Sequence, residues 1–156
     1  MGLKKETTLC PNNLTRFKSA QTRDYQTALA EIRVGKKRSH WMWYIFPQLQ
    51  GLGFSEISHY YGIRGMEEAR SYLADDLLRS RLLEISEALL ALKSDNATEV
   101  MGCPDDMKLK SSMTLFLLAA QNDSAYEKEA GVFKGVLDKF FGGKMDERTV
   151  GMCDIM

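Results

Sequence analysis

The sequence is poor in the residues that build metal sites and disulfide frameworks. Its three cysteines, Cys10, Cys103 and Cys153, are widely separated and form no C-x-x-C pair, and its two histidines are His40 and His59. This excludes a zinc knuckle and a thioredoxin-type motif, and we predict no metal and no cofactor. Free thiols are typical of a reducing compartment, so we expect a cytoplasmic protein.

The chain also lacks an excess of either charge. Its 21 Lys and Arg residues equal its 21 Asp and Glu residues, and the formal net charge is zero. Proteins that attract nucleic acid carry a basic surface, and here the one local candidate is the run Lys36-Lys37-Arg38. RNA binding through this run stays a minor alternative, and we predict no nucleic-acid partner.

Long apolar runs are absent as well. No stretch approaches the length of about 18 apolar residues that marks a transmembrane helix, and residues 1–6 contain no apolar signal core. The last four residues, Cys153-Asp154-Ile155-Met156, have the form of a prenylation box. Asp154 stands where that motif prefers an aliphatic residue, and no polybasic run precedes it. We therefore expect an unmodified tail and no membrane partner.

The composition is that of one ordinary globular domain. Hydrophobic residues make up 44% and charged residues 27% of the 156 residues, and a chain of this length can bury a core without disulfides or metal. Residues 1–13 are polar and end in a Pro-Asn-Asn break, and residues 144–156 follow a Gly-Gly pair. We predict a flexible leader at 1–13, a helical domain at 14–143 and a C-terminal tail at 144–156.

Apolar residues recur at helical spacing through most of the chain. The clearest run is Leu78, Leu82, Ile85, Leu89 and Leu92, at steps of four and three. No alternating pattern of period two persists in any segment. The pattern predicts an all-α fold, a single compact domain of six to seven short-to-medium helices.

The segment 39–46 is apolar on every side. It is the string Ser-His-Trp-Met-Trp-Tyr-Ile-Phe, it contains both tryptophans, and Pro47 ends it. A helix of this composition belongs in a core, with Ser39 as its N-cap. A buried strand is the alternative, because short apolar runs fit both. Most of the aromatic rings are predicted to be core, although a flat ligand could stack on one of them.

This segment and several others resemble the family called domain of unknown function 1810, whose members are sometimes labelled calpastatin. The resemblance covers roughly residues 14–150 and is carried by the string from Ser39 to Gln48, together with Arg16-Phe17, Gly51-Leu52-Gly53, Tyr61-Gly62-Ile63 and Lys108 to Phe116. It implies an all-helical fold and brings no established activity. A second similarity, to proteins that process NAD and ADP-ribose derivatives, rests on the order of Met113, Gln121-Asn122 and Phe140.

Three residues near the aromatic string have side chains suited to ligand chemistry. His40 carries an imidazole, the side chain most often used as a catalytic acid or base. Gln48 offers a donor and an acceptor in a glycine-containing loop, which lets the backbone approach a ligand. Arg38, like Arg16, could hold an anion through its guanidinium. The structural alternatives are a histidine bonded to a carbonyl, a hinge turn and a surface ion pair.

Lys108, Ser111 and Ser112 form a second candidate set. Spacings of three and four place them on one side of a predicted helix. They lie in its first two turns, where free N–H groups and the helix dipole attract anions. The set could hold a phosphate, or it could form a solvated polar face.

Together the two sets favour a pocket for a small anionic, nucleotide-like molecule of the ADP-ribose type. The sequence leaves open whether such a domain is an enzyme; His40 would be its catalytic residue. The alternative is a helical protein-interaction module without enzymatic activity, in which the aromatic string is entirely core.

Overall fold

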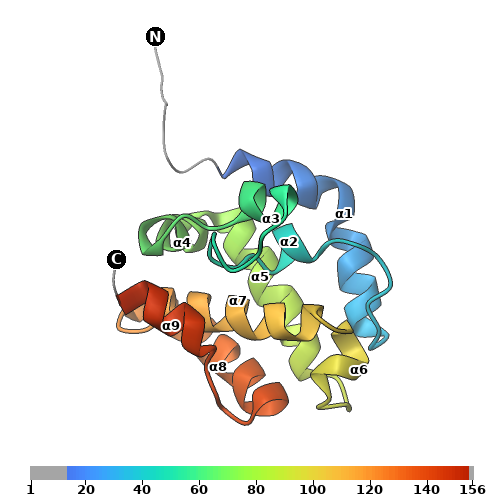
Figure 1. Ribbon diagram of the computed structural model, residues 1–156. Coiled ribbons are helices and arrows are strands. Elements are labelled where there is room, and N and C mark those ends of the chain that lie inside the picture. The colour runs from blue at the N-terminus through green and yellow to red at the C-terminus, as the bar shows by residue number, and fades with distance from the viewer. Residues whose placement is uncertain (1–13, 155–156) are drawn as a thin grey trace.

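The computed structural model describes residues 14–154, and this part of the chain is all-helical (Figure 1). The elements in chain order are α1 (Thr15–Arg33), α2 (Met42–Ile45), α3 (Glu56–Tyr61), α4 (Met66–Ala74), α5 (Asp76–Leu90), α6 (Ala97–Met101), α7 (Asp105–Ala120), a 3-10 turn η1 (Ser124–Tyr126), α8 (Glu127–Phe141) and α9 (Glu147–Asp154). The all-α prediction is confirmed. Of the nine α-helices in this range, six have seven or more residues. The helices α2, α3 and α6 are too short to be predicted from apolar spacing, because a spacing pattern needs at least two turns.

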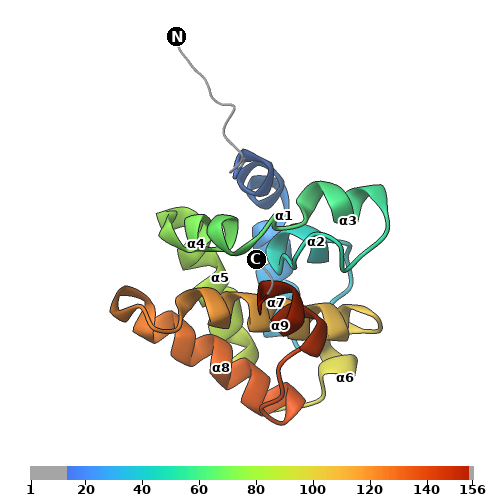
Figure 2. The ribbon, with the colours of Figure 1, turned by 60° about the vertical axis from the view of Figure 1, so that its left-hand side comes forward.

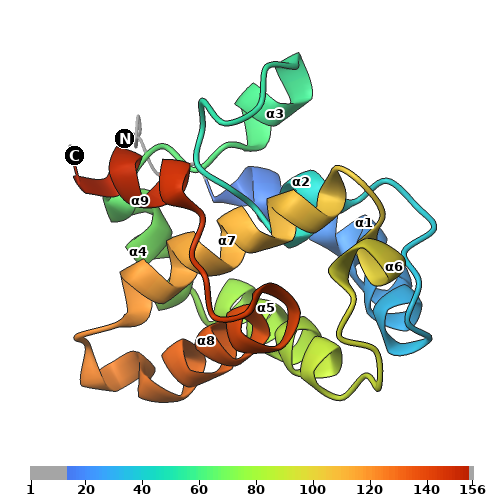
Figure 3. The ribbon, with the colours of Figure 1, turned by 60° about the horizontal axis from the view of Figure 1, so that its bottom comes forward.

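α7 is the central helix of the domain. It packs against α4, α6, α8 and α9, and it crosses the middle of the molecule (Figures 1 and 3). From Leu109 to Ala120 every side chain is buried except those of Lys110 and Leu118, which are half-buried. A helix that is covered around its circumference belongs to the core, and beyond its first turn α7 exposes only parts of Lys110 and Leu118.

The helix predicted from the leucine run is α5. Leu78, Leu82, Ile85 and Leu89 are all buried on the face that packs against α1 and α8. The Asp75 carboxylate accepts a hydrogen bond of 3.0 Å from the backbone N–H of Leu78 and caps the helix. Each buried leucine or isoleucine contributes about 1.5–3 kcal/mol relative to exposure, so this stripe fixes the contact between α5 and α1.

The aromatic string forms a shorter helix than the sequence predicts. α2 covers only Met42–Ile45, and its N-cap residue is Trp41 rather than Ser39. Ser39 lies outside the helix because its hydroxyl donates a hydrogen bond to Glu31 of α1 instead. The strand alternative is wrong for this segment, which is helical. The prediction that most of the rings are core is confirmed, and the buried side chains of the string are Trp41, Met42, Tyr44, Ile45 and Phe46.

Residues 50–62, here called the flap, project from the body of the domain with α3 at their centre (Figures 2 and 3). The flap is closed at its base by a parallel bridge between Leu49 and Ile63. In this bridge the N–H of Gln50 donates to the carbonyl of Ile63 (2.8 Å) and the N–H of Ile63 donates to the carbonyl of Gln48 (2.9 Å). No residue of α3 is buried, so the bridge and the contacts of its flanking segments hold the flap.

Arg16 anchors the C-terminal end of the flap, residues 60–62. Its guanidinium donates to the carbonyls of Tyr60 (2.8 Å) and Gly62 (2.9 Å). It also forms an ion pair of 2.7 Å with Glu68, and both side chains are at most 2% exposed. The prediction that Arg16 is a surface cation is therefore wrong. A guanidinium with buried carboxylate and carbonyl partners is a structural group rather than an anion clamp.

The C-terminal segment is more ordered than a tail. α9 packs against α7, and the N–H of Asp146 donates to the hydroxyl of Thr114 in α7 (2.9 Å). This helix falls within residues 144–156, which the sequence assigns to a tail beyond the helical domain. The leader at 1–13 and Met156 lie outside the described residues. Within the part of the chain that the structure covers, no helix has the length and apolar character of a membrane span.

Candidate functional site

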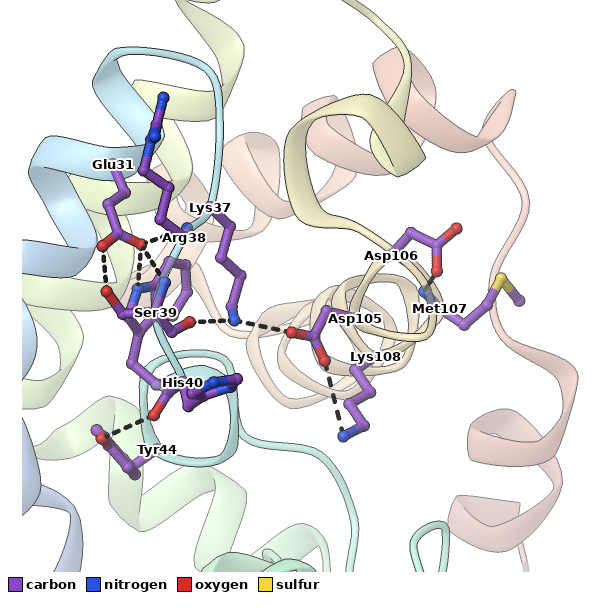
Figure 4. Close-up of polar contacts among 11 residues, drawn as sticks. Glu31, Lys37, Arg38, Ser39, His40, Tyr44, Asp105, Asp106, Met107 and Lys108 are labelled. Carbon is purple, nitrogen blue, oxygen red and sulfur yellow. Dashed lines mark hydrogen bonds and ion pairs between the residues drawn. The ribbon is translucent and has the colours of Figure 1, made fainter.

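The segment that leads into α2 is organised by one carboxylate, Glu31 at the end of α1. Its oxygens accept hydrogen bonds from the N–H groups of Arg38 (2.8 Å) and Ser39 (3.0 Å), from the Ser39 hydroxyl, and from the Trp41 indole (2.9 Å). Glu31 is buried. The loop that carries His40 is therefore wrapped around a buried anion (Figure 4).

These hydrogen bonds decide the ionisation of Glu31. Burial acts to raise the pKa of its carboxyl, but the bonds from Ser39, Arg38 and Trp41 outweigh it and lower the pKa to about 2. A carboxyl whose pKa is lower in the folded state stabilises the fold above its unfolded pKa, near 4.5. That stabilisation is lost as the pH falls from about 4.5 to about 2.

We expect Glu31→Gln to weaken the fold at neutral pH and to reduce its sensitivity to acid. The neutral amide is a weaker acceptor for the donors around it, so the free energy of unfolding should fall by about 1.5–3 kcal/mol. Urea unfolding between pH 7 and pH 2 measures both effects. Some acid dependence should persist, because hydrogen bonds involving Lys18 and Leu78 also lower the pKa of Asp75, against the effect of burial.

Glu87→Gln is the matched control, since Glu87 is exposed on α5. It should leave stability within about 0.5 kcal/mol of the wild type. An acid profile of Glu31→Gln with the wild-type slope would show that Glu31 is not the carboxylate that organises this loop.

A chain of charged contacts connects this loop to the start of α7. The Lys37 ammonium donates to the carbonyl of Ser39 and pairs with Asp105 (2.9 Å), and its side chain is 6% exposed. Asp105 also pairs with Lys108 (3.7 Å). The Lys108 ammonium in turn lies 5.4 Å from the centroid of the Trp43 ring. Figure 4 shows His40 at the edge of this chain of contacts.

Trp43 and Lys108 line a small pocket between α2, the flap and α7. The pocket has a cavity volume of about 10 Å³ and we call it the Trp43 pocket; its lining residues are Met42, Trp43, Phe46, Gln48, Ser58, Tyr61, Gly62 and Lys108. Trp43 is the one half-buried member of a string whose other apolar side chains are buried. The pocket therefore combines aromatic walls with one cation and one amide.

The structure brings together two of the predicted site residues and leaves two others at the surface, outside the pocket lining. Gln48 and Lys108 both line the Trp43 pocket. His40 and Arg38 are exposed and belong to the loop that leads into α2. The His40 imidazole makes no hydrogen bond within residues 14–154, so the alternative of a histidine locked to a carbonyl does not hold there.

Ser111 and Ser112 lie in the second turn of α7, as the sequence predicts, but both side chains are buried. Ser111 is 7% exposed and its hydroxyl donates to the carbonyl of Met107 (3.2 Å). Ser112 is fully buried, and its hydroxyl has no hydrogen-bond partner in the described structure. The solvated polar face is therefore wrong, because α7 is covered on this side by the rest of the core.

The first turn of α7 is also less open to anions than the sequence suggests. Two carboxylates, Asp105 and Asp106, already occupy it. Asp106 accepts hydrogen bonds from the N–H of Met107 (2.8 Å) and from the Thr98 hydroxyl (2.7 Å). Because the helix dipole and N–H groups act on these side chains first, Lys108 is the group at this end of α7 that remains for an anionic ligand.

A larger groove lies between α7 and α9. It has a volume of about 800 Å³, and its lining residues are Lys110, Lys144, Met145, Asp146, Glu147, Arg148, Val150, Gly151 and Asp154. Its three cations face three carboxylates, and it contains no aromatic ring. Because its charges balance and it is open to solvent, we give the smaller aromatic pocket more weight as a ligand site.

Sequence reasoning missed most of the pocket walls. Ser58 and Tyr61 come from α3, a segment separate from the 39–46 string, and no spacing rule relates the two segments. The available signal was the Trp-Met-Trp string itself, although it does not show which tryptophan reaches the surface. Among the described residues, no group of three or more His, Cys, Asp or Glu side chains is arranged to hold a metal.

Comparisons with known proteins support the fold and the family resemblance. A family model with the description "Protein of unknown function (DUF1810)" matches residues 11–153. The crystal structure of the conserved hypothetical protein Rv1873 from Mycobacterium tuberculosis is similar to this chain, with 42% sequence identity and a TM-score of 0.86. The similarity covers 94% of this chain and 99% of that one. The comparison with curated proteins finds no match.

Proposed function

The chain belongs to the DUF1810 family of proteins of unknown function, and from its geometry we propose that it binds a small anionic, nucleotide-like molecule at the Trp43 pocket. The observation that carries this proposal is the pairing of Lys108 with the face of Trp43 at 5.4 Å. An aromatic face beside a cation suits a ligand that has both a flat ring and a negative charge.

Neighbouring charged side chains fix the position of the Lys108 ammonium over Trp43. Asp105 lies 3.7 Å from the Lys108 ammonium and limits where that ammonium points. The half-buried Lys37–Asp105 ion pair fixes Asp105 in turn. Because Lys37 neutralises Asp105, Lys108 keeps its charge available for a ligand.

His40 and Arg38 extend the proposed site beyond the pocket lining. Both are exposed on a loop that Glu31 holds in place. If the domain catalyses a reaction, hydrolysis or transfer at a glycosidic or phosphoryl centre suits His40 as the acid or base and Arg38 as a second contact to the anion. We place the protein in the cytoplasm, and the free thiols of Cys103 and Cys153 support this.

We expect Lys108→Met to abolish binding of phosphate-bearing ligands while the fold stays intact. Methionine keeps an unbranched stem on Trp43 but removes the charge. A thermal-shift screen with nucleotides, ADP-ribose and inorganic phosphate identifies a ligand of the wild type. A ligand at 100 times its Kd should stabilise the wild type by about 2.7 kcal/mol and the variant far less.

Lys110→Met is the matched control. Lys110 lies two residues further along α7, is also half-buried, and lines the larger groove instead of the Trp43 pocket. It should bind the same ligand as the wild type does. Loss of binding in Lys110→Met with normal binding in Lys108→Met would place the site in the groove and overturn this proposal.

One observation favours the alternative of a protein-interaction module. Phe54, Ile57 and Tyr60 are 93%, 40% and 55% exposed on the flap. Ile57 and Tyr60 lie one helical step of three apart on α3, and Phe54 just precedes that helix. Exposed apolar side chains that cluster in this way often mark a protein contact. The ligand screen separates the two functions, because an interaction module without a pocket function gives no stabilisation with any small anion.

A further inference from the structure

We infer that the Trp43 pocket accepts one heteroaromatic base that presents a hydrogen-bond donor beside an acceptor, that Gln48 recognises this edge, and that the flap opens to admit it. This inference rests on the proposed function and specifies the ligand of the same site. It assigns the ring to the pocket and the anionic group to Lys108 at the pocket's rim.

The walls of the pocket are suited to a flat ring. Trp43, Phe46 and Tyr61 line it from the α2 segment and from the flap. Tyr61 is held in place by neighbouring rings, at centroid distances of 5.0 Å to Tyr44 and 6.2 Å to Phe17. Because every base has an aromatic face, such walls attract bases without selecting among them. Selection therefore requires a polar group within the pocket.

Gln48 is that polar group. Its side-chain amide is half-buried in the pocket lining and makes no hydrogen bond to any other residue in the range 14–154. Its backbone is fixed, because its carbonyl accepts the bridge hydrogen bond from Ile63 (2.9 Å). An amide offers one donor and one acceptor in a plane, and a glutamine pairs with a base edge through both at once. The Gln48 amide therefore offers a free donor and a free acceptor, from a fixed backbone position, to the hydrogen-bonding edge of a base.

The size of the pocket requires the flap to move. Its cavity volume of about 10 Å³ is that of roughly one water molecule and lies far below the 300–1,000 Å³ that is usual for small-molecule sites. The closed pocket therefore has no room for a ring. The flap forms one wall of this space through Ser58, Tyr61 and Gly62, so a ring can enter only when the Ser58 part of that wall moves away from Trp43.

The contacts of the flap point to residues 51–59, which include Ser58, as the moving part. Residues 60–62 are tied down, because Arg16 binds the carbonyls of Tyr60 and Gly62. The moving part contains Gly51, whose φ of +102° suits glycine. Gly53 packs closely against α3, because a Cβ atom there would come within 2.7 Å of the Ser58 hydroxyl. Gly51, followed by a helix with no buried residue, allows residues 51–59 to swing together.

The test compares mononucleotides with ribose 5-phosphate, using tryptophan fluorescence of the full chain. The probes are the 5′-monophosphates of adenosine, guanosine, cytidine and uridine. We expect the best of them to bind at least roughly tenfold more tightly than ribose 5-phosphate, as a bidentate glutamine contact implies. Gln48→Leu should lose this preference and keep its affinity for ribose 5-phosphate. Gln26→Leu, an exposed position on α1, is the control and should keep the preference.

Each outcome bears on one of the two claims. Equal binding of ribose 5-phosphate and all four mononucleotides overturns the base site and leaves the anion site standing. A Gln48→Leu variant that folds normally and keeps the preference overturns the role of Gln48. If no probe binds the wild type, the proposed function itself fails, and this inference fails with it.

Hydrogen exchange tests the movement of the flap. The amides of Gln50 and Ile63, which close its base, and those of residues 51–59 should exchange more slowly when the best mononucleotide is saturating. Unchanged exchange across residues 50–63 at saturation would contradict an opening flap.

Discussion

Trp41→Ala is expected to lower the free energy of unfolding by about 3–5 kcal/mol, the usual cost of removing a large aromatic side chain from a core. Trp41 is 1% exposed. Its ring packs against Phe46 at a centroid distance of 6.3 Å, and the Lys37 ammonium lies 4.8 Å from the ring centroid. The substitution also removes one of the donors to Glu31. Urea unfolding followed by circular dichroism measures the loss.

Trp43→Ala is the informative comparison. The sequence assigns both tryptophans to one apolar string and gives no reason to separate them, but Trp43 is half-buried and lines the pocket. Its removal should cost less than about 2 kcal/mol, since only part of its surface is withdrawn from water, and it should abolish ligand binding. Equal destabilisation by both substitutions would contradict the distinction between a structural and a ligand-facing tryptophan.

Arg16→Met is expected to have an effect of similar size, about 3–5 kcal/mol. It leaves the carboxylate of Glu68 buried without its guanidinium partner, and removal of one member of a buried ion pair carries this cost. The backbone N–H of Arg64, at 3.1 Å, is a remaining donor to Glu68. The flap also loses the bonds from Arg16 to Tyr60 and Gly62, so hydrogen exchange there should accelerate.

The double variant Arg16→Met, Glu68→Met separates the loss of a contact from the burial of a lone charge. With both charges removed, the buried site becomes apolar, and the double variant should be more stable than Arg16→Met alone. A double variant that is less stable than the single one would show that Glu68 stabilises the fold independently of Arg16.

The helices could be predicted from the sequence wherever an apolar stripe repeats over several turns. The stripe from Leu78 to Leu89 is α5 as expected, because steps of three and four bury one face whatever the rest of the chain does. The 39–46 segment shows where this argument ends. Ser39 has the residue type of an N-cap, but its hydroxyl bonds to Glu31, which is eight residues earlier in the chain. The hydrogen bond from Ser39 to Glu31 of α1 overrides the local preference of Ser39 for an N-cap position.

The candidate site could be predicted only in part for the same reason. Gln48 and Lys108 meet in one pocket because α2 packs beside the first turns of α7 (Figure 3). Ser112 shares a helix face with Lys108, yet it is fully buried. Spacing along a helix gives the direction of a side chain and not the depth at which the core covers it. Residue types alone could not reveal that Trp43 reaches the pocket and Trp41 does not.

The most direct test of the proposed binding site is amide chemical-shift mapping of the ¹⁵N-labelled protein with adenosine 5′-monophosphate. We predict that the largest shifts fall on residues 42–48, on the flap at 50–62 and on the start of α7 around Lys108. We also predict that they disappear in Lys108→Met. Shifts centred on Lys110, Lys144 and Arg148 in the groove beside α9, or no shifts at millimolar nucleotide, would contradict a nucleotide-like ligand at the Trp43 pocket.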